Sequence, residues 1–267
     1  MRNIDPFWGP YDRDSGWVPS LRYLLRRARL LAFFAEGQRG RLLEVGCGAG
    51  ALLIELAHLG YDCTGLETSE RAHAHATRLA GVYGFDATRL HRNPSSGWHA
   101  YFDFVLACDV LEHIEDDRGA LLQWAEWLRP GAKLVLTVPA HSRAWSAGDV
   151  WAGHFRRYDK TPLVTLLEKS GYSVDHIECY GFPLANLTET FGAFYYKRAL
   201  AKRVRYSKNQ ASSLSGIERR PYLLAHRMVH SWAGKALLQL GMAMQDTSLT
   251  SDLGSGYLVV ASRSCVA

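Results

Sequence analysis

The sequence has no uninterrupted apolar run that approaches the roughly 20 residues of a membrane-spanning helix. Its first six residues lack the apolar core of a secretory signal peptide. The five cysteines are scattered and odd in number, which argues against a disulfide framework, and their spacing matches no metal-binding pattern. We therefore expect a protein of the reducing cytoplasm that holds no metal.

A strong charge of one sign is also absent. The formal net charge is +5 over 267 residues, and from so small an excess we expect no nucleic-acid partner. The basic residues do gather in one aromatic-rich stretch, 191–208. Two interpretations of it remain open: a helical lid whose charges face water, and a surface that makes peripheral contact with a membrane. The sequence indicates no oligomeric state.

A helix is expected at residues 21–35, where apolar residues alternate with arginines at helical spacing. Ser20 precedes it and is a suitable N-cap. The arginines are Arg22, Arg26, Arg27 and Arg29. The simplest interpretation is that they form a solvated helix face.

Three alternating glycines, Gly46, Gly48 and Gly50, connect a short apolar run to the apolar stretch 51–57. This order indicates a strand, a glycine turn and a helix. Glycine adopts backbone angles that other residues avoid and lets a ligand approach the main chain. The N–H groups at the start of the helix favour negative charge. We therefore expect the turn to bind a small, partly anionic ligand.

Two acids flank this turn. Glu67 ends the next expected strand, where a carboxylate can accept both hydroxyls of an adenosine ribose. Glu44 stands two residues before Gly46. A carboxylate at that place would repel a pyrophosphate but could pair with an amino group. The two acids favour an adenosine cofactor that carries an amino group.

Strands and helices alternate along the first two thirds of the chain, which indicates a doubly wound parallel sheet. Strands are expected at 41–45, 62–67, 85–92, 102–108, 133–138, 172–180 and 256–261, with 129–131 as a break and a late helix at 219–244. In such sheets, ligands bind beyond the carboxyl ends of the strands.

Two motifs carry a resemblance to a known family. Residues 44–50 read E-x-G-x-G-x-G, and residues 109–113 read D-V-L-E-H. Together they resemble the class I S-adenosylmethionine-dependent methyltransferases, in particular those related to ubiquinone and menaquinone biosynthesis. The resemblance covers residues 40–180. The G-H-x-R-R-Y sequence at 153–158 resembles a subgroup of these enzymes.

The resemblance implies a seven-stranded, mostly parallel Rossmann-like α/β sheet, with an antiparallel last strand and a helical insertion before it. On this basis the chain divides into four parts. They are an N-terminal arm and cap helix at 1–36, a cofactor-binding core at 37–180, a helical lid or insertion at 181–252 and a final core strand at 253–267.

The resemblance also implies S-adenosylmethionine as cofactor and S-adenosylhomocysteine as product. The implied cofactor site consists of Glu44, Gly46, Cys47, Gly48, Gly50, Glu67, Thr68, Asn93, Cys108, Asp109 and Val110. The family's usual acid at the adenine position is missing, and Asn93 or a backbone carbonyl would replace it.

A hydroxyl acceptor requires a base near the transition state. Histidine suits this task because its unperturbed pKa is ~6.5, and the candidates are His113 and His154. We expect the acceptor to be a small molecule, such as a secondary metabolite, quinone, sugar or lipid-linked compound. Its expected contacts are Trp17, Trp145, Arg157, Tyr158 and Tyr195.

The most favoured function is therefore O-methylation of a small molecule. Two alternatives remain open. A NAD(P)-dependent oxidoreductase would explain the glycines and Glu67, but it would not explain Glu44. A non-catalytic partner protein that binds S-adenosylmethionine would keep the same motifs without turnover.

Overall fold

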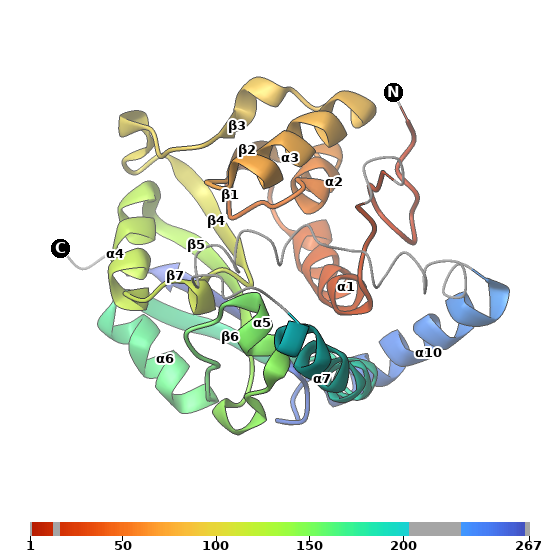
Figure 1. The fold of residues 1–267 in the computed structure, drawn as a ribbon. Coiled ribbons are helices and arrows are strands. Elements are labelled where there is room, and N and C mark those ends of the chain that lie inside the picture. Colours follow the sequence, from red (N-terminus) through yellow and green to blue (C-terminus); the bar gives the residue numbers. More distant parts are fainter. Residues whose placement is uncertain (1, 13–16, 203–230, 265–267) are drawn as a thin grey trace.

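The computed structural model describes residues 2–12, 17–202 and 231–264. Its centre is one seven-stranded sheet in the order β3-β2-β1-β4-β5-β7-β6 (Figure 1). The strands are β1 Arg41–Val45, β2 Asp62–Leu66, β3 Leu90–His91, β4 Phe102–Cys108, β5 Leu128–Pro139, β6 Tyr172–Tyr180 and β7 Gly256–Arg263. Strands β1 to β5 pair in parallel, and β7 runs antiparallel to both neighbours. The expected fold class is confirmed.

Helices flank the sheet (Figure 1). They are α1 Leu21–Glu36, α2 Ala51–His58, α3 Glu70–Tyr83, α4 Asp117–Trp127, α5 Ala147–Ala152, α6 Lys160–Lys169, α7 Leu184–Lys202 and α10 Trp232–Ser248. Successive strand residues point to opposite faces. In β1, Leu43 and Val45 join the core cluster that includes residues of α4 and α6, whereas Leu42 joins the one with α1, α2 and α3. None of the described helices meets the length and apolarity required to cross a bilayer.

Two expectations about the strands are wrong in extent. The expected strand 85–92 contains only the two residues of β3, because residues 87–89 form a 3₁₀ turn that is capped by the side chain of Asp86. The expected break at 129–131 lies inside β5, where a register shift occurs between Phe102 and Phe104 of β4. The shift leaves residues 129–132 of β5 without partners on β4, so the break is absorbed without ending the strand.

Helices α7 and α10 lie between β6 and β7 in the sequence, at the place of the expected insertion. Gln245 of α10 ties it to the core: its amide oxygen accepts from the Gly181 N–H at 2.8 Å, and its amide nitrogen donates to the Leu25 carbonyl at 3.2 Å. Residues 219–230 of the expected late helix lie outside the described residues. The division of the chain into four parts stays a prediction.

The arginines of α1 are not a solvated face, and that interpretation is wrong. Arg27 is 5% exposed. Its Nε donates to Glu55 of α2 at 2.7 Å, and its Nη1 donates to the Phe7 carbonyl at 3.0 Å. Amphipathic spacing showed that the helix has two faces. It could not show that acids of α2, α7, α10, β6 and the segment after β4 lie against the polar face.

We expect Glu55→Ala to lower the free energy of unfolding by about 3 kcal/mol, because it leaves the buried Arg27 guanidinium without its partner. Arg89→Ala is the matched control. It removes an ion pair with Asp62 in which both side chains are more than 40% exposed, and it should cost less than about 1 kcal/mol. Urea unfolding of the three proteins gives both values. Equal losses would contradict the assignment of the α1–α2 pair as a buried one.

Candidate functional site

A cavity of about 1570 Å³ opens at the carboxyl ends of β1, β2 and β4. Its walls come from the glycine turn, the segment after β4, and helices α1, α5 and α7. Ligand pockets commonly span about 300–1,000 Å³, so this cavity has room for a cofactor and a second molecule. Its position is the one where ligands bind in doubly wound sheets.

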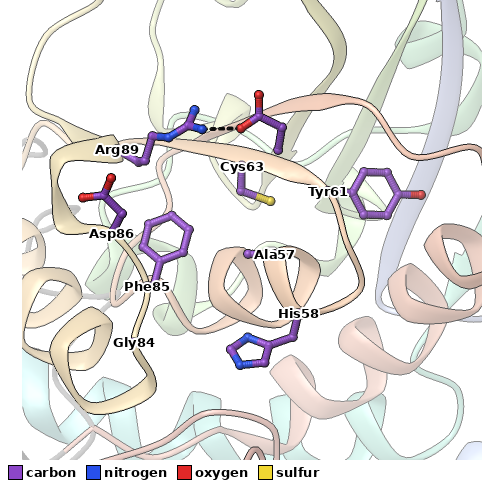
Figure 2. A pocket seen from close by; sticks show the side chains of 9 residues that line it. Ala57, His58, Tyr61, Cys63, Gly84, Phe85, Asp86 and Arg89 are labelled. Atoms are coloured by element: carbon purple, nitrogen blue, oxygen red, sulfur yellow. Dashed lines mark hydrogen bonds and ion pairs between the residues drawn. The ribbon is translucent and has the colours of Figure 1, made fainter. Parts of the chain in front are cut away.

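A second, smaller pocket of about 330 Å³ lies at the other end of β2 (Figure 2). His58 and Tyr61 line it together with Asp62 and Arg89, whose side chains form an ion pair. This pocket is at the amino end of the strand, away from the glycine turn. The large cavity is therefore the candidate site.

The glycine turn needs its glycines. Gly46, Gly48 and Gly50 have φ values of 64°, 56° and 75°, which side chains disfavour. A Cβ on Gly46 would lie 2.6 Å from Val110 Cγ2, whereas a Cβ on Gly48 would meet nothing within 4 Å. The first glycine is required by packing against the segment after β4. The second leaves open space in the cavity for a ligand.

Glu67 is held beside this turn by two hydrogen bonds from the backbone. One carboxylate oxygen accepts the Gly48 N–H at 2.9 Å, and the other accepts the Ser69 N–H at 2.8 Å. Burial raises the pKa of Glu67, and these two hydrogen bonds oppose the rise. The side chain lines the cavity. Its remaining lone pairs could accept hydroxyl groups of a ligand.

Glu44 is 4% exposed, and its Oε2 has no hydrogen-bond partner among the described residues. Burial raises its pKa to about 8, although the charge of Arg26 opposes the rise. A buried polar atom without a partner is costly. An ammonium group in the cavity would satisfy it, so this residue fits the amino group of a cofactor.

Asp109 follows β4 with a φ of 53° and lines the cavity. Arg22 and Arg26 of α1 both form ion pairs with its carboxylate, the Arg22 pair at 3.4 Å. Burial alone would raise the pKa of Asp109, but these two arginines lower it. The carboxylate is therefore ionised and already neutralised by protein.

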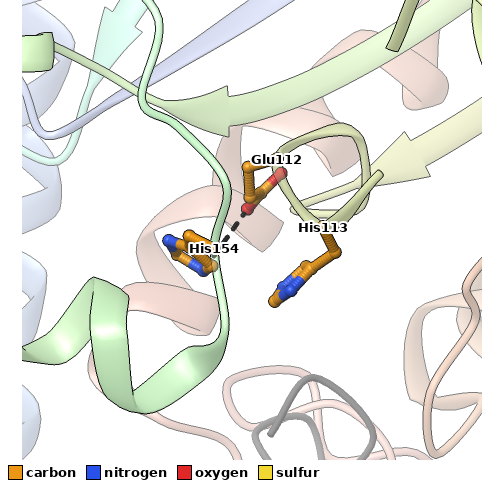
Figure 3. Close-up of side chains that lie close together, drawn as sticks. All are labelled: Glu112, His113 and His154. Atoms are coloured by element: carbon orange, nitrogen blue, oxygen red, sulfur yellow. Dashed lines mark ion pairs between the residues drawn. The ribbon is translucent and has the colours of Figure 1, made fainter. Parts of the chain in front are cut away.

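Glu112, His113 and His154 lie close together (Figure 3) and all three line the cavity. The two imidazole rings meet edge to face with centroids 4.6 Å apart. Burial, together with the neighbouring His154, lowers the pKa of His113 to about 3. Glu112 is fully buried, and neither of its carboxyl oxygens has a hydrogen-bond partner among the described residues. Burial and the charge of Asp109 raise the pKa of Glu112 well above its usual value.

His154 is oriented by Asp149. Its Nδ1 lies 2.9 Å from Asp149 Oδ1. Burial opposes ionisation of Asp149, but hydrogen bonds from His154 and Arg157 hold its pKa below the usual range. An ionised partner at Nδ1 means that this nitrogen carries the proton. Nε2, which lies 3.9 Å from Glu112 Oε1, is left as a proton acceptor.

Helix α7 is tied to this arrangement by Glu189. Both terminal nitrogens of Arg157 donate to Glu189 Oε2 at 3.3 Å, while Arg157 Nε donates to Asp149 at 2.8 Å. Arg22 of α1 donates to the other oxygen of Glu189 at 2.5 Å. One carboxylate on α7 therefore joins the helix that carries Asp149 to the helix that neutralises Asp109.

Most residues expected at the site line this cavity. They are Trp17, Glu44, Gly46, Cys47, Gly48, Glu67, Thr68, Cys108, Asp109, Val110, His113, His154, Arg157 and Tyr195. The lining does not include Gly50, Asn93, Trp145 or Tyr158. Tyr158 is buried instead in the core, and its hydroxyl donates to Asp117 at 3.1 Å. The structure thus gives Tyr158 a supporting place below the site and leaves Trp145, 43% exposed, outside it.

The residues expected at the site did not include Arg22, Arg26, Asp149 or Glu189, all of which line the cavity. The spacing Ser146-x-x-Asp149 is a capping-box signal, and the structure contains that box at the start of α5. It could have located Asp149 at a helix start beside His154. No sequence pattern distinguishes Glu189, because its role depends on two arginines that are far away in the chain.

Two clusters among the described residues have the ligand types of a metal site. Glu112, His113 and His154 form one, and His141, Cys179 and Asp252 form the other, each with ligand atoms within 4.8 Å of one another. Imidazoles with a carboxylate suit divalent transition metals. The first cluster lies in the cavity wall, where His154 would have to use Nε2 as the ligand atom. The expectation of no metal stays a prediction.

Residues 19–177, more than half of the chain, match the model of a protein family described as methyltransferase domain. The chain is also 28% identical over 143 residues to the ubiquinone biosynthesis O-methyltransferase of Pectobacterium atrosepticum. That alignment covers 51% of this chain and 58% of the relative. The chain therefore spans little more than half the length of this curated relative.

Solved structures share the fold. An S-adenosylmethionine-dependent methyltransferase from Mesorhizobium loti superposes with a TM-score of 0.54 at 16% identity, covering 91% of this chain and 98% of that one. The cyclase SpnF superposes with a TM-score of 0.53 at 17% identity, covering 99% and 89%. At these identities the similarity shows the fold alone. The reaction has to be argued from the site.

The raised pKa of Glu44 predicts a pH-dependent cofactor affinity. An ammonium ligand favours the ionised carboxylate, which the free protein populates only as the pH approaches about 8. Glu44→Gln imitates the protonated form at every pH. Calorimetry with S-adenosylmethionine should therefore find that wild type and variant bind the cofactor with similar affinity near pH 6. The ratio of the wild-type affinity to the variant affinity should then rise by up to about tenfold per pH unit towards pH 8.

Comparing the two proteins at each pH cancels the titration of the ligand's own amino group. Glu70→Gln is the control, since the Glu70 side chain is 86% exposed on α3 and should follow wild type throughout. A ratio of wild-type to variant affinity that stays constant with pH would show that Glu44 does not contact the ammonium group.

Proposed function

This chain belongs to the family of class I S-adenosylmethionine-dependent methyltransferase domains, and we propose that it transfers a methyl group to an oxygen atom of a small-molecule acceptor. The observation that carries the proposal is the Asp149–His154 pair, which places a free imidazole nitrogen in the wall of the cofactor cavity. The relative from Pectobacterium atrosepticum is named an O-methyltransferase, which supports oxygen as the accepting atom.

The residues divide the work between binding and proton transfer. Glu44 and Glu67 hold the amino and ribose groups of the cofactor, and the open face of Gly48 admits it. When bound, S-adenosylmethionine supplies a methyl group that its sulfonium already activates. Holding donor and acceptor in line can contribute about 7–11 kcal/mol to catalysis. The protein therefore needs few reactive groups.

His154 accepts the proton of the acceptor hydroxyl at Nε2 as the O–C bond forms and the C–S bond breaks. The Asp149 carboxylate then stabilises the imidazolium, since it already accepts the Nδ1–H. His113 is a weak base, because its pKa of about 3 leaves it little tendency to hold a proton near neutrality. Of the two histidines expected from the sequence, His154 is the one that we propose as base.

The oxidoreductase alternative fits this site poorly. A dinucleotide would bring its pyrophosphate to the glycine turn. There the buried Glu44 carboxyl has an unpartnered oxygen, and its ionised form would repel the phosphates. A non-catalytic binding protein would have no use for a histidine oriented by a buried carboxylate.

His154→Asn should lower methyl transfer by about 10²–10⁴-fold, the usual contribution of a general base. Turnover is followed as S-adenosylhomocysteine formed with a panel of phenols, catechols and sugars, and then with the acceptor that responds. Cofactor affinity, measured by calorimetry, should stay within about twofold. Asp149→Asn should slow turnover with the same unchanged affinity, because it removes the group that fixes the tautomer.

His176→Asn is the control for this pair. His176 lies on β6 with its side chain 57% exposed, and its replacement should leave turnover unchanged. Full turnover by His154→Asn with cofactor bound would remove His154 from the mechanism.

The proposed base cannot accept a proton at Nε2 and hold a metal ion there at the same time. We therefore expect dialysis against EDTA to leave turnover unchanged. Glu112→Gln should have little effect, because burial and the charge of Asp109 disfavour the ionised form of that carboxyl. Loss of turnover in EDTA that added Zn²⁺ or Mg²⁺ restores, with a large loss in Glu112→Gln, would contradict the base and assign the cluster to a metal.

A further inference from the structure

The outward face of α7 is apolar and uncovered. Leu187, Phe191 and Phe194 are 53%, 77% and 60% exposed. The opposite face packs on the protein: Ala185 is buried in a core cluster, and Tyr196 packs on Trp151 of α5. Large apolar side chains exposed together on one helix face commonly mark an interaction site. No other described residue covers this outward face.

The exposed face continues into the mouth of the cofactor cavity. Phe191 and Tyr195 line the cavity and are also more than half exposed. A partner bound to the outward face of α7 would therefore lie next to the opening of the cavity. If that partner is apolar, an apolar acceptor could pass from it into the cavity without entering water.

Charge indicates the kind of occupant. Lys197 and Arg198 are exposed on α7, and the Arg198 guanidinium lies 4.2 Å from the centroid of the Phe194 ring. Residues 191–230 contain nine lysines and arginines and a single acid, Glu218, while the whole chain has a formal net charge of only +5. Residues 203–230 of this stretch, including part of the expected 191–208 surface, lie outside the described residues. The sequence around α7 is thus the basic part of the chain.

We propose that the outward face of α7 docks on an anionic lipid surface. Leu187, Phe191 and Phe194 enter the boundary between headgroups and acyl chains, and Lys197 and Arg198 contact the headgroups. A nucleic acid would satisfy the charges but leave three large apolar side chains in water. A second copy would cover the apolar side chains but bring two basic faces together.

Sedimentation with vesicles tests this proposal without any methyl transfer, so its failure is distinct from failure of the proposed reaction. The two vesicle types are phosphatidylcholine alone and an equal mixture of phosphatidylcholine and phosphatidylglycerol. The intact chain should partition at least about tenfold more strongly into the mixed vesicles, and added salt should reduce the difference.

Matched variants separate the apolar and charged contributions. Phe194→Glu should lower partitioning at least about tenfold, whereas Leu122→Glu should not, since Leu122 is 44% exposed on α4, which lies apart from α7 (Figure 1). Lys197→Gln should weaken only the binding to mixed vesicles, and Lys169→Gln on α6 should match wild type. All four positions are exposed, and thermal unfolding checks that each variant is folded.

Three results would overturn the proposal. The first is absence of binding to either vesicle type. The second is equal binding by wild type and Phe194→Glu. The third is self-association of the chain that Phe194→Glu abolishes, without vesicle binding, which would assign the face to a second copy.

Discussion

The site depends on the neutralisation of buried and partly buried acids by arginines of one helix. Arg22, Arg26 and Arg27 of α1 form ion pairs with carboxylates of α7, of the segment after β4 and of α2. A buried charge that lost its partner would cost several kcal/mol. Helix α1 therefore does more than close the cavity: it makes a dense group of acids compatible with a folded state.

The same electrostatic arrangement gives two neighbouring histidines different roles. His113 Nδ1 has no hydrogen-bond partner among the described residues, and burial together with its neighbour His154 lowers the pKa of His113. His154 donates to Asp149, whose charge Arg157 also stabilises. The two imidazole rings have centroids 4.6 Å apart. One lines the cavity as a weak base and the other is the candidate general base, because their surroundings differ.

Helix α7 belongs to both the site and the surface. Its inward carboxylate, Glu189, ties it to Arg22 and Arg157, while its outward aromatics are exposed at the cavity mouth. These ion pairs add to the apolar contacts of Ala185 and Tyr196 in holding the helix against the protein. An element held in this way can present an apolar face outward, and that face is what the proposed lipid contact would use.

Much of the fold could be predicted from the sequence, because its signals are local. Glycines at 46, 48 and 50 specify a turn, the run 102–108 specifies a buried strand, and the alternation of elements specifies a parallel sheet. The expected strand at 85–92 was mostly wrong, because the competing local signal was Asp86, whose side chain caps a 3₁₀ turn. Local hydrogen bonding there overrides the apolar pattern.

The gathering of Glu44, Gly48 and Glu67 at one cavity was also predictable, since they lie on or next to strands whose carboxyl ends must meet at one edge. The acceptor end was not. The exclusion of Tyr158 from the cavity and the pairing of Glu189 with Arg22 depend on contacts between elements far apart in the chain. The sequence alone determined the position of the glycine turn, because backbone angles are a local property. Only the tertiary structure decided which histidine has a buried acid behind it, because burial and charge are set by neighbours that no spacing reveals.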